Sequence, residues 1–417
     1  MEHVLGFECV DCSRHHRPGD VDYVCPNCGG NLDVIYDYER IRAAGFGRST
    51  LERDHNLTIW RYRALLPINP DSVPPPLTVG WTPVYDSESL AARFGVKQLL
   101  IKDDGRNPTA SFKDRPSSLA VVKAKEAGAQ VLTTASSGNA GVALAGMCSS
   151  VGTKSVVFVP AAAPPAKLAQ LQIYGATVVL VEGNYDDAYD LCLQAGGAFG
   201  WYQRSTGYNP FMSEGKKTAA FEICEQMNWE VPDKVFVGVG DGCIIGGLWK
   251  GFREMKQLGL IDTVPQMIAV QSEKARAIVD ACSGDGVARE RPAETIADSI
   301  NVGKPRDAVK AIKAIKESGG YAVAVSDDSI LSSIGQLARA TGVFVEPAAA
   351  AAFAGFGRMC ESGAIKADER VLLMLTGNGL KDVQAVARTA TPCIRVGPDL
   401  SETTEALMAA GFRMPSR

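Results

Sequence analysis

The stretch Lys234-Val-Phe-Val-Gly-Val-Gly-Asp-Gly-Cys-Ile-Ile-Gly-Gly247 leads an apolar run directly into a glycine-rich turn and then into a helical pattern. An apolar run without alternation is typical of a strand that is covered on both faces of a parallel sheet. Glycines in the turn allow the backbone to approach an anion closely and to present consecutive N–H groups. Because Cys243 stands where a dinucleotide fingerprint needs a third glycine, the turn suits one terminal phosphate better than a nucleotide.

Strand and helix patterns alternate along the chain around this stretch. We expect strands at residues 98–102, 130–134, 155–159, 177–181, 234–239, 266–271, 321–325 and 370–375. Helical patterns lie between them at residues 117–126, 167–174, 185–194, 215–227 and 245–257. This alternation predicts an α/β fold with parallel sheets, in which ligands bind at the carboxyl ends of the strands.

Composition indicates an ordinary globular protein. Of 417 residues, 46% are hydrophobic and 22% are charged, and 43 Lys and Arg against 47 Asp and Glu leave a formal charge of −4. This balance argues against a nucleic-acid partner. A charge-free stretch at residues 130–153 is interrupted by polar residues and does not suit a membrane span, and the acidic first residues do not resemble a secretion signal. We expect a soluble cytoplasmic protein without a membrane partner.

Histidine is confined to the beginning of the chain. The four histidines are His3, His15, His16 and His55. Beyond residue 55 the chain therefore cannot build a Ser-His-Asp triad, a Cys-His pair or a histidine metal site. Proton transfer in the main body must come from lysine, a carboxylate, tyrosine, cysteine or a cofactor.

Four of the eleven cysteines form two Cys-x-x-Cys pairs, Cys9 with Cys12 and Cys25 with Cys28. This spacing is typical of tetrahedral thiolate coordination of Zn²⁺ in a small ribbon. So short a segment buries little core, and a bound metal would contribute its folding free energy. Two disulfides or free thiols are the alternative, which a reducing compartment disfavours.

Two further turns follow predicted strands and carry polar side chains. The first, residues 134–141, offers the hydroxyls of Ser136 and Ser137, the carboxamide of Asn139 and free N–H groups at a helix start, which suit a carboxylate or phenolate oxygen. An ordinary capped turn is the alternative. In the second, Thr376 stands at the end of an apolar strand, where its hydroxyl could donate to a ring nitrogen or cap the turn.

Lys113 precedes a helix in which Pro116 suits the first turn, so the lysine is expected at the amino end of that helix. A cation is disfavoured there by about 0.3–1 kcal/mol, and burial beside Phe112 would lower its pKa further. A neutral amine is the form that a Schiff base requires. A surface charge is the alternative for any single lysine; the phosphate loop and the missing histidines favour the catalytic role.

Together these segments resemble the fold type II pyridoxal-phosphate enzymes, the tryptophan-synthase-β fold type, and among them the threonine synthases. The resemblance covers residues 81–385 and rests on motifs in a fixed order. They are Gly80-Trp-Thr-Pro83, Ala110-Ser-Phe-Lys-Asp-Arg115, Ala135-Ser-Ser-Gly-Asn-Ala-Gly141, Asn209-Pro-Phe-Met-Ser-Glu-Gly-Lys-Lys-Thr218, Glu346-Pro-Ala-Ala349 and Leu375-Thr-Gly-Asn-Gly-Leu-Lys-Asp382.

The resemblance implies a two-lobed α/β enzyme with an amino-terminal zinc ribbon. It places the ribbon at residues 1–38, the large cofactor-binding domain at 39–116 and 211–417, and a small mobile domain at 117–210. A homodimer is usual for such enzymes, and the expected partner is a small amino-acid substrate, phosphorylated in the threonine synthases.

The resemblance also assigns roles to the candidate residues. Lys113 would bind pyridoxal 5'-phosphate covalently and move protons, Asn139 would bond the cofactor's phenolate oxygen, and Thr376 would face its ring nitrogen. The cofactor phosphate would lie on the amides of Gly240, Asp241, Gly242, Cys243 and Ile244. The substrate carboxylate would lie on Ser136, Ser137, Gly138 and Asn139.

The implied reaction converts O-phosphohomoserine and water to threonine and phosphate. Two residues depart from the family pattern. Asp241 puts a carboxylate in the phosphate loop, and Met212 stands where many members carry a basic residue. These departures leave open a cysteate synthase that uses O-phosphoserine and sulfite, or a serine/threonine dehydratase. A catalytically inactive zinc-ribbon binding protein is a further alternative, which would bind no yellow cofactor.

Overall fold

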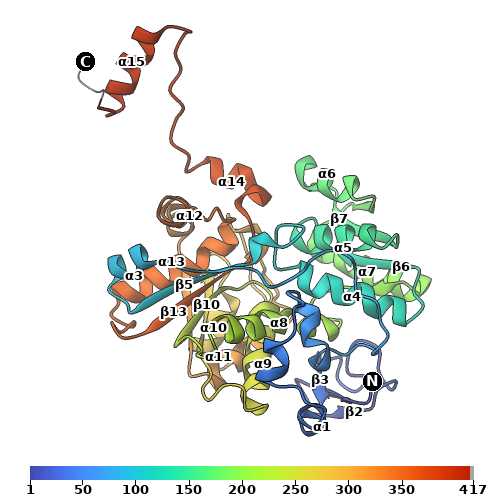
Figure 1. The fold of residues 1–417 in the computed structure, drawn as a ribbon. Coiled ribbons are helices and arrows are strands. Elements are labelled where there is room, and N and C mark those ends of the chain that lie inside the picture. The colour runs from blue at the N-terminus through green and yellow to red at the C-terminus, as the bar shows by residue number, and fades with distance from the viewer. Residues whose placement is uncertain (414–417) are drawn as a thin grey trace.

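The structure is a computed structural model that describes residues 1–413 (Figure 1). It contains two sheets built mainly from parallel strands, and the larger of them has six strands. Its order is β12–β11–β10–β13–β5–β4, and neighbouring strands are parallel except β4 with β5. The strands are β4 (Val84–Asp86), β5 (Gln98–Asp103), β10 (Lys234–Gly238), β11 (Gln266–Ser272), β12 (Tyr321–Val325) and β13 (Arg370–Leu375).

Helices cover both faces of this sheet, which explains why its central strands are mostly apolar. Along β10, Val235 and Val237 enter one hydrophobic core while Phe236 enters the other, because successive side chains point to opposite faces. The first face is covered by α8 (Phe211–Gln226), α9 (Cys243–Gln257), α10 (Ala277–Ser283) and α11 (Ala308–Glu317). The second is covered by α3 (Glu88–Phe94), α12 (Asp327–Thr341) and α13 (Pro347–Glu361).

A second, four-stranded sheet is built from the middle of the chain, with the order β8–β7–β6–β9 and all pairs parallel. Its strands are β6 (Val131–Ala135), β7 (Lys154–Pro160), β8 (Thr177–Val181) and β9 (Tyr202–Gln203). The helices around it are α4 (Asp114–Glu126), α5 (Asn139–Ser150), α6 (Pro165–Ile173) and α7 (Tyr185–Phe199). These elements form the green lobe of Figure 1, beside the larger sheet.

The eight predicted strands all occur, with ends within one residue of the prediction, so the α/β fold class is confirmed. The short strands β4 and β9 were not predicted, because two or three residues carry no periodic pattern. Helix α4 begins at Asp114, a turn earlier than predicted. Pro116 is tolerated there because the first N–H groups of a helix have no intrahelical acceptor.

The amino-terminal segment forms a small antiparallel sheet of β1 (Val4–Cys9), β2 (His15–His16) and β3 (Leu32–Tyr36). It does not rely on its own core alone. Phe7 and Val34 belong to the same apolar cluster as α8 and α9, and the hydroxyl of Tyr36 donates to Glu214 at 2.5 Å. Packing against the main body therefore contributes to the stability of this segment.

The remaining elements connect these layers or follow them. They are α1 (Tyr38–Ala43), α2 (Arg48–Glu52), α14 (Val383–Ala387), α15 (Leu400–Ala409) and the 3-10 turns η1 (Ile59–Leu65), η2 (Asp104–Arg106), η3 (Asp298–Ile300) and η4 (Gly379–Asp382). Helix α15 stands away from the body at the end of an extended segment (Figure 1). Within residues 1–413 there is no helix with the length and apolar character needed to cross a membrane.

Arg115 joins the first turn of α4 to the larger lobe through a fully buried ion network. Its guanidinium donates to Asp104 at 2.6 Å and to Glu222 at 2.5 Å, and Lys102 Nζ donates to Glu222 at 2.7 Å. Burial alone would raise the pKa of Glu222, but the charges of Arg115 and Lys102 lower this pKa to about 2. Two cations and two carboxylates compensate one another, which makes their joint burial tolerable.

Replacement of Glu222 by alanine is expected to destabilise the protein by about 3–5 kcal/mol, because Arg115 and Lys102 would remain buried without their shared carboxylate. Urea unfolding measures this change. Glu230→Ala is the matched control, since Glu230 pairs with Arg370 at the surface and should contribute less than about 1 kcal/mol. Equal effects of the two substitutions would contradict a stabilising role for the network.

Candidate active site

Lys113 is the residue immediately before α4 and lies against the turn that follows β13. The N–H of Phe112 donates to the carbonyl of Thr376 at 2.8 Å, and the N–H of Asn378 donates to the carbonyl of Ala110 at 3.1 Å. Ala110 adopts a left-handed conformation, with φ of 64°, that turns the chain into this position. Backbone bonds therefore hold Lys113 and Thr376 together although they are far apart in the sequence.

The glycine-rich turn after β10 lines one cavity together with Lys113 and Thr376. A Cβ at Gly242, where φ is +99°, would lie 2.7 Å from the carbonyl oxygen of Asp307. A Cβ at Gly240 would lie 3.0 Å from Cα of Ile300. The turn therefore requires glycine at both positions, because the segment that ends at Asp307 packs directly onto its backbone.

Burial is the main reason that the pKa of Lys113 is lowered from its ordinary value. The charge of Glu346 opposes this shift, and the charge of Arg204 adds to it. The structure thus favours the neutral amine at Lys113, the form that attacks an aldehyde or accepts a proton. This direction agrees with the expectation from the sequence, where helix position and burial were the two proposed causes.

Lys216, on α8, lines the same cavity and was not singled out in the sequence. It is 1% exposed, and the described part of the chain offers its Nζ no hydrogen-bond partner. Burial lowers its pKa to about 8. A buried amine without a carboxylate, beside a turn made of glycine, suits a phosphate group. The residues present therefore fit a phosphate-bearing cofactor.

Asp241, the unexpected carboxylate in the glycine-rich turn, is bound by the neighbouring segment. Its Oδ1 accepts the N–H of Arg306 at 3.2 Å, and its carbonyl accepts the N–H of Asp307 at 3.0 Å. Burial raises the pKa of Asp241 above the ordinary value. A carboxyl group whose pKa is raised and whose oxygen already accepts a backbone N–H repels a neighbouring phosphate less than a free carboxylate would.

A second cavity, of about 320 Å³, shares Lys113 and Asp241 with the first. The predicted substrate-binding residues line it together: Ser136, Ser137, Gly138 and Asn139. Helix α5 begins at Asn139, so the N–H groups of its first turn are available to an anion. A Cβ at Gly141 would lie 2.1 Å from the carbonyl of Ser136, which explains the small residues in this turn.

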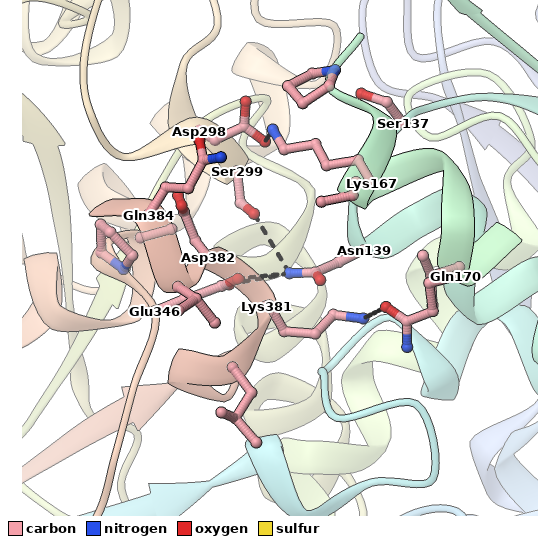
Figure 2. A pocket seen from close by; sticks show the side chains of 18 residues that line it. Ser137, Asn139, Lys167, Gln170, Asp298, Ser299, Glu346, Lys381, Asp382 and Gln384 are labelled. Carbon is pink, nitrogen blue, oxygen red and sulfur yellow. Dashed lines mark hydrogen bonds and ion pairs between the residues drawn. The ribbon is translucent and has the colours of Figure 1, made fainter. Parts of the chain in front are cut away.

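Asn139 makes a contact that the sequence did not predict. Its Nδ2 donates to both carboxylate oxygens of Glu346, at 3.0 and 2.9 Å, and to Ser299 at 3.3 Å (Figure 2). Burial raises the pKa of Glu346, and the bond from Asn139 opposes the shift. Glu346 belongs to a motif noted in the sequence, but a glutamate before a proline gives no sign of which side chain it will meet.

A third cavity, of about 180 Å³, opens beside Asn139 and lies between the two lobes (Figure 2). Lys167 on α6 pairs with Asp298 at 2.8 Å. Lys381 on η4 donates to Gln170 on α6 at 3.0 Å. These contacts connect the smaller lobe to segments of the larger lobe at the rim of the site.

The four amino-terminal cysteines also come together, away from the cavities. Sγ atoms of Cys9, Cys12, Cys25 and Cys28 all lie within 4.8 Å of one another. The closest pairs are 3.5 and 3.8 Å apart, too far for a disulfide, and all four are free thiols. In each Cys-x-x-Cys motif the first cysteine, Cys9 or Cys25, is buried, and the second, Cys12 or Cys28, is exposed. The cluster could hold a metal ion.

The fold and the lysine–glycine-loop site define a pyridoxal-phosphate enzyme, and comparison with known proteins agrees. The family described as "Pyridoxal-phosphate dependent enzyme" matches residues 76–377, and the chain belongs to it. Among curated relatives, the threonine synthase of Methanocaldococcus jannaschii is 41% identical over 94% of this chain and 97% of its own. The threonine synthase of Methanosarcina acetivorans is 39% identical over 91% and 93%.

Solved structures share the fold at lower identity. Diaminopropionate ammonia lyase from Escherichia coli superposes with a TM-score of 0.65 and 20% identity, covering 82% of this chain and 92% of that one. Threonine deaminase isoform 2 from Solanum lycopersicum has a TM-score of 0.62 and 22% identity, covering 79% and 83%. Both similarities support the architecture described above.

Lys216→Met is expected to weaken binding of pyridoxal 5'-phosphate to the cofactor-free protein about 10- to 100-fold, because a charged bond to the phosphate is lost. Because Lys216 has a pKa of about 8, the wild-type affinity should fall as pH rises above 8. Titration followed by absorbance measures both effects. Pyridoxal, which lacks the phosphate, is the control ligand; an equal loss of pyridoxal affinity in the variant would contradict the assignment.

Proposed function

We propose that the protein is a threonine synthase that converts O-phosphohomoserine and water to threonine and inorganic phosphate with bound pyridoxal 5'-phosphate. The observation that carries the proposal is the position of Lys113, a half-buried lysine that lines two cavities at once. One cavity offers a glycine turn and Lys216 for a phosphate, and the other offers Ser136 and Ser137 for an amino acid. Curated relatives named threonine synthase over more than nine-tenths of the chain support the choice of reaction.

The residues that would hold the cofactor come from four segments. The amides of residues 240–244 and the amine of Lys216 would bind its phosphate, and Lys113 would bind its aldehyde. Asn139 would donate to its phenolate oxygen in place of the present bond to Glu346. Thr376 would present a hydroxyl to its ring nitrogen. When bound, the cofactor stabilises negative charge on the substrate carbon atoms next to the amino group.

The chain's own groups would bind the substrate and move its protons. Ser136, Ser137 and the free amides at the start of α5 would bind the substrate carboxylate. In its neutral form, the amine of Lys113 would accept the proton from Cα, release it, and then accept one from Cβ before phosphate leaves from Cγ. Lys113 would return one proton to Cγ, water would add its hydroxyl at Cβ while its remaining proton goes to the released phosphate, and a proton would return to Cα last. Because histidine is missing beyond residue 55, this lysine is the base best placed for these steps.

Lys113→Ala is expected to abolish turnover and the absorbance of the covalently bound cofactor, since Lys113 is the lysine that lines both cavities, whereas Lys216 lines only the one proposed to hold the phosphate. The wild-type protein should release phosphate and threonine from O-phosphohomoserine in equal amounts, measured together in one assay. Lys304→Ala is the control, because Lys304 is an exposed lysine of the segment outside the cavities. A dehydratase would be favoured instead if the protein made pyruvate from serine or 2-oxobutyrate from threonine and made no threonine from O-phosphohomoserine.

We also propose that the four-cysteine cluster binds Zn²⁺ and stabilises the amino-terminal ribbon. Four sulfurs at this mutual spacing suit tetrahedral thiolate coordination, and a metal would neutralise thiolates that otherwise repel one another. A homodimer and closure of residues 117–210 over the substrate are proposed on the same family grounds. Such closure would act on the contacts between the lobes that Lys167 and Lys381 make.

Cys25→Ser is expected to lose the metal and to lower the thermal stability of the ribbon while cofactor absorbance is largely kept, because the ribbon lies outside the cavities. Metal content per chain, measured by elemental analysis, checks this. Cys393→Ser is the matched control, since Cys393 is an exposed cysteine distant from the cluster in the sequence. Equal metal content in Cys25→Ser and the parent protein would refute the site.

A further inference from the structure

Arg204 is a buried arginine at the carboxyl end of the smaller sheet. It follows β9, and its N–H donates to the carbonyl of Thr133 on β6 at 2.8 Å. This pairing places Arg204 beside the turn that begins at Thr134. Its side chain is fully buried, yet it lines the 320 Å³ cavity together with Ser136 and Lys113. No motif in the sequence marks this residue as functional.

The guanidinium of Arg204 has hydroxyl partners but no carboxylate. Nε donates to Ser117 at 3.1 Å, and Nη1 donates to Thr206 at 3.1 Å. Nη2 is buried, and no acceptor for it exists among residues 1–413; across the same residues no carboxylate lies within ion-pair distance of Arg204. Burial lowers its pKa to about 10. Burying an unpaired guanidinium is strongly unfavourable, so the site has the character of one completed by an anion.

The other buried arginines show what a purely structural role looks like. Arg115 meets two carboxylates, and Arg61, 7% exposed, meets Glu225 and three backbone carbonyls. Both guanidinium groups are compensated by the chain itself. Arg204 differs from them because one of its donors has no acceptor in the described chain while its side chain borders a cavity, and because its charge acts on the amines of Lys113 and Lys216 and not on a paired carboxylate.

Three anionic groups must be placed in a complex of a phosphorylated amino acid with this cofactor. The glycine turn and Lys216 suit the cofactor phosphate, and Ser136 with the start of α5 suits the substrate carboxylate. The substrate phosphate then lacks a cation. Met212, at the position where many family members are basic, cannot supply one: it is 1% exposed and packs in an apolar cluster with Tyr202.

We propose that Arg204 binds the phosphate group of the amino-acid substrate and thereby determines specificity for a phosphorylated over a free hydroxy amino acid; this rests on the proposed function. A guanidinium fork matches two phosphate oxygens, which an ammonium group does not. The hydroxyls of Ser117 and Thr206 hold the fork at Nε and Nη1 and leave Nη2 without an acceptor among the described residues. In this chain the basic residue for the substrate phosphate would therefore stand at the end of β9 and not at position 212.

The test uses the holoenzyme with Arg204→Met, Arg204→Gln and Arg204→Lys. Met and Gln are expected to raise KM for O-phosphohomoserine about 10- to 100-fold, the loss of one or two charged bonds, and to weaken competitive inhibition by inorganic phosphate to a similar extent. Cofactor absorbance should stay unchanged. Lys should restore part of the affinity for inorganic phosphate, because it keeps the charge but not the fork. Lys304→Met, which removes a charge outside the cavities, should change neither constant.

Unchanged KM and unchanged phosphate inhibition in a variant that retains cofactor would overturn the assignment. If Arg204→Met or Arg204→Gln loses the cofactor or fails to fold, Arg204→Lys decides by the same two constants. If the wild-type protein makes no threonine, the proposed function fails, but calorimetric binding of inorganic phosphate to the holoenzyme still tests Arg204. Binding that is equal in the wild type and in Arg204→Lys would then reject the proposal separately.

Discussion

The buried ion pair between Arg115 and Glu222 is the contact on which the active site depends. It holds the first turn of α4 against α8, and Lys113 is only two residues before the arginine. The backbone bond from Phe112 to Thr376 completes the placement from the other side. Because both contacts are buried, the lysine has little freedom to turn toward solvent. The burial that lowers the pKa of Lys113 is therefore maintained by the contacts of its flanking residues.

Charge compensation separates the structural cations of this protein from the functional ones. Lys102 and Arg115 are fully buried and share carboxylates, so their burial is balanced within the chain. Half-buried Lys113 and fully buried Arg204 and Lys216 line two cavities that share Lys113, and Arg204 and Lys216 keep buried donors without partners in the described chain. Buried cationic donors without partners are costly unless anions enter. A cofactor and a substrate that both carry phosphate would supply the missing charges.

Much of the fold was predictable because its strands are apolar runs and its turns are rich in glycine. The eight longer parallel strands, the helices after the glycine-rich turn and after residues 134–141, and the cysteine pairs all follow from local patterns. The short strands β4 and β9 could not be predicted, since they are defined by their neighbours. The contact between Asn139 and Glu346 was also beyond prediction, because it joins residues 207 positions apart.

Some features of the candidate site could be inferred from the sequence, and others became visible only in the tertiary structure. Residue type and spacing alone pointed to Lys113 as a reactive amine, to the glycine turn as a phosphate site and to the exclusion of histidine from catalysis, because these are properties of local sequence. The roles proposed for Arg204 and Lys216 could be inferred only from the tertiary structure. Whether a charged side chain is a solvated surface group or a buried cation without a counter-charge depends on which distant carboxylates the packing brings to it, and no neighbour in the chain carries that information.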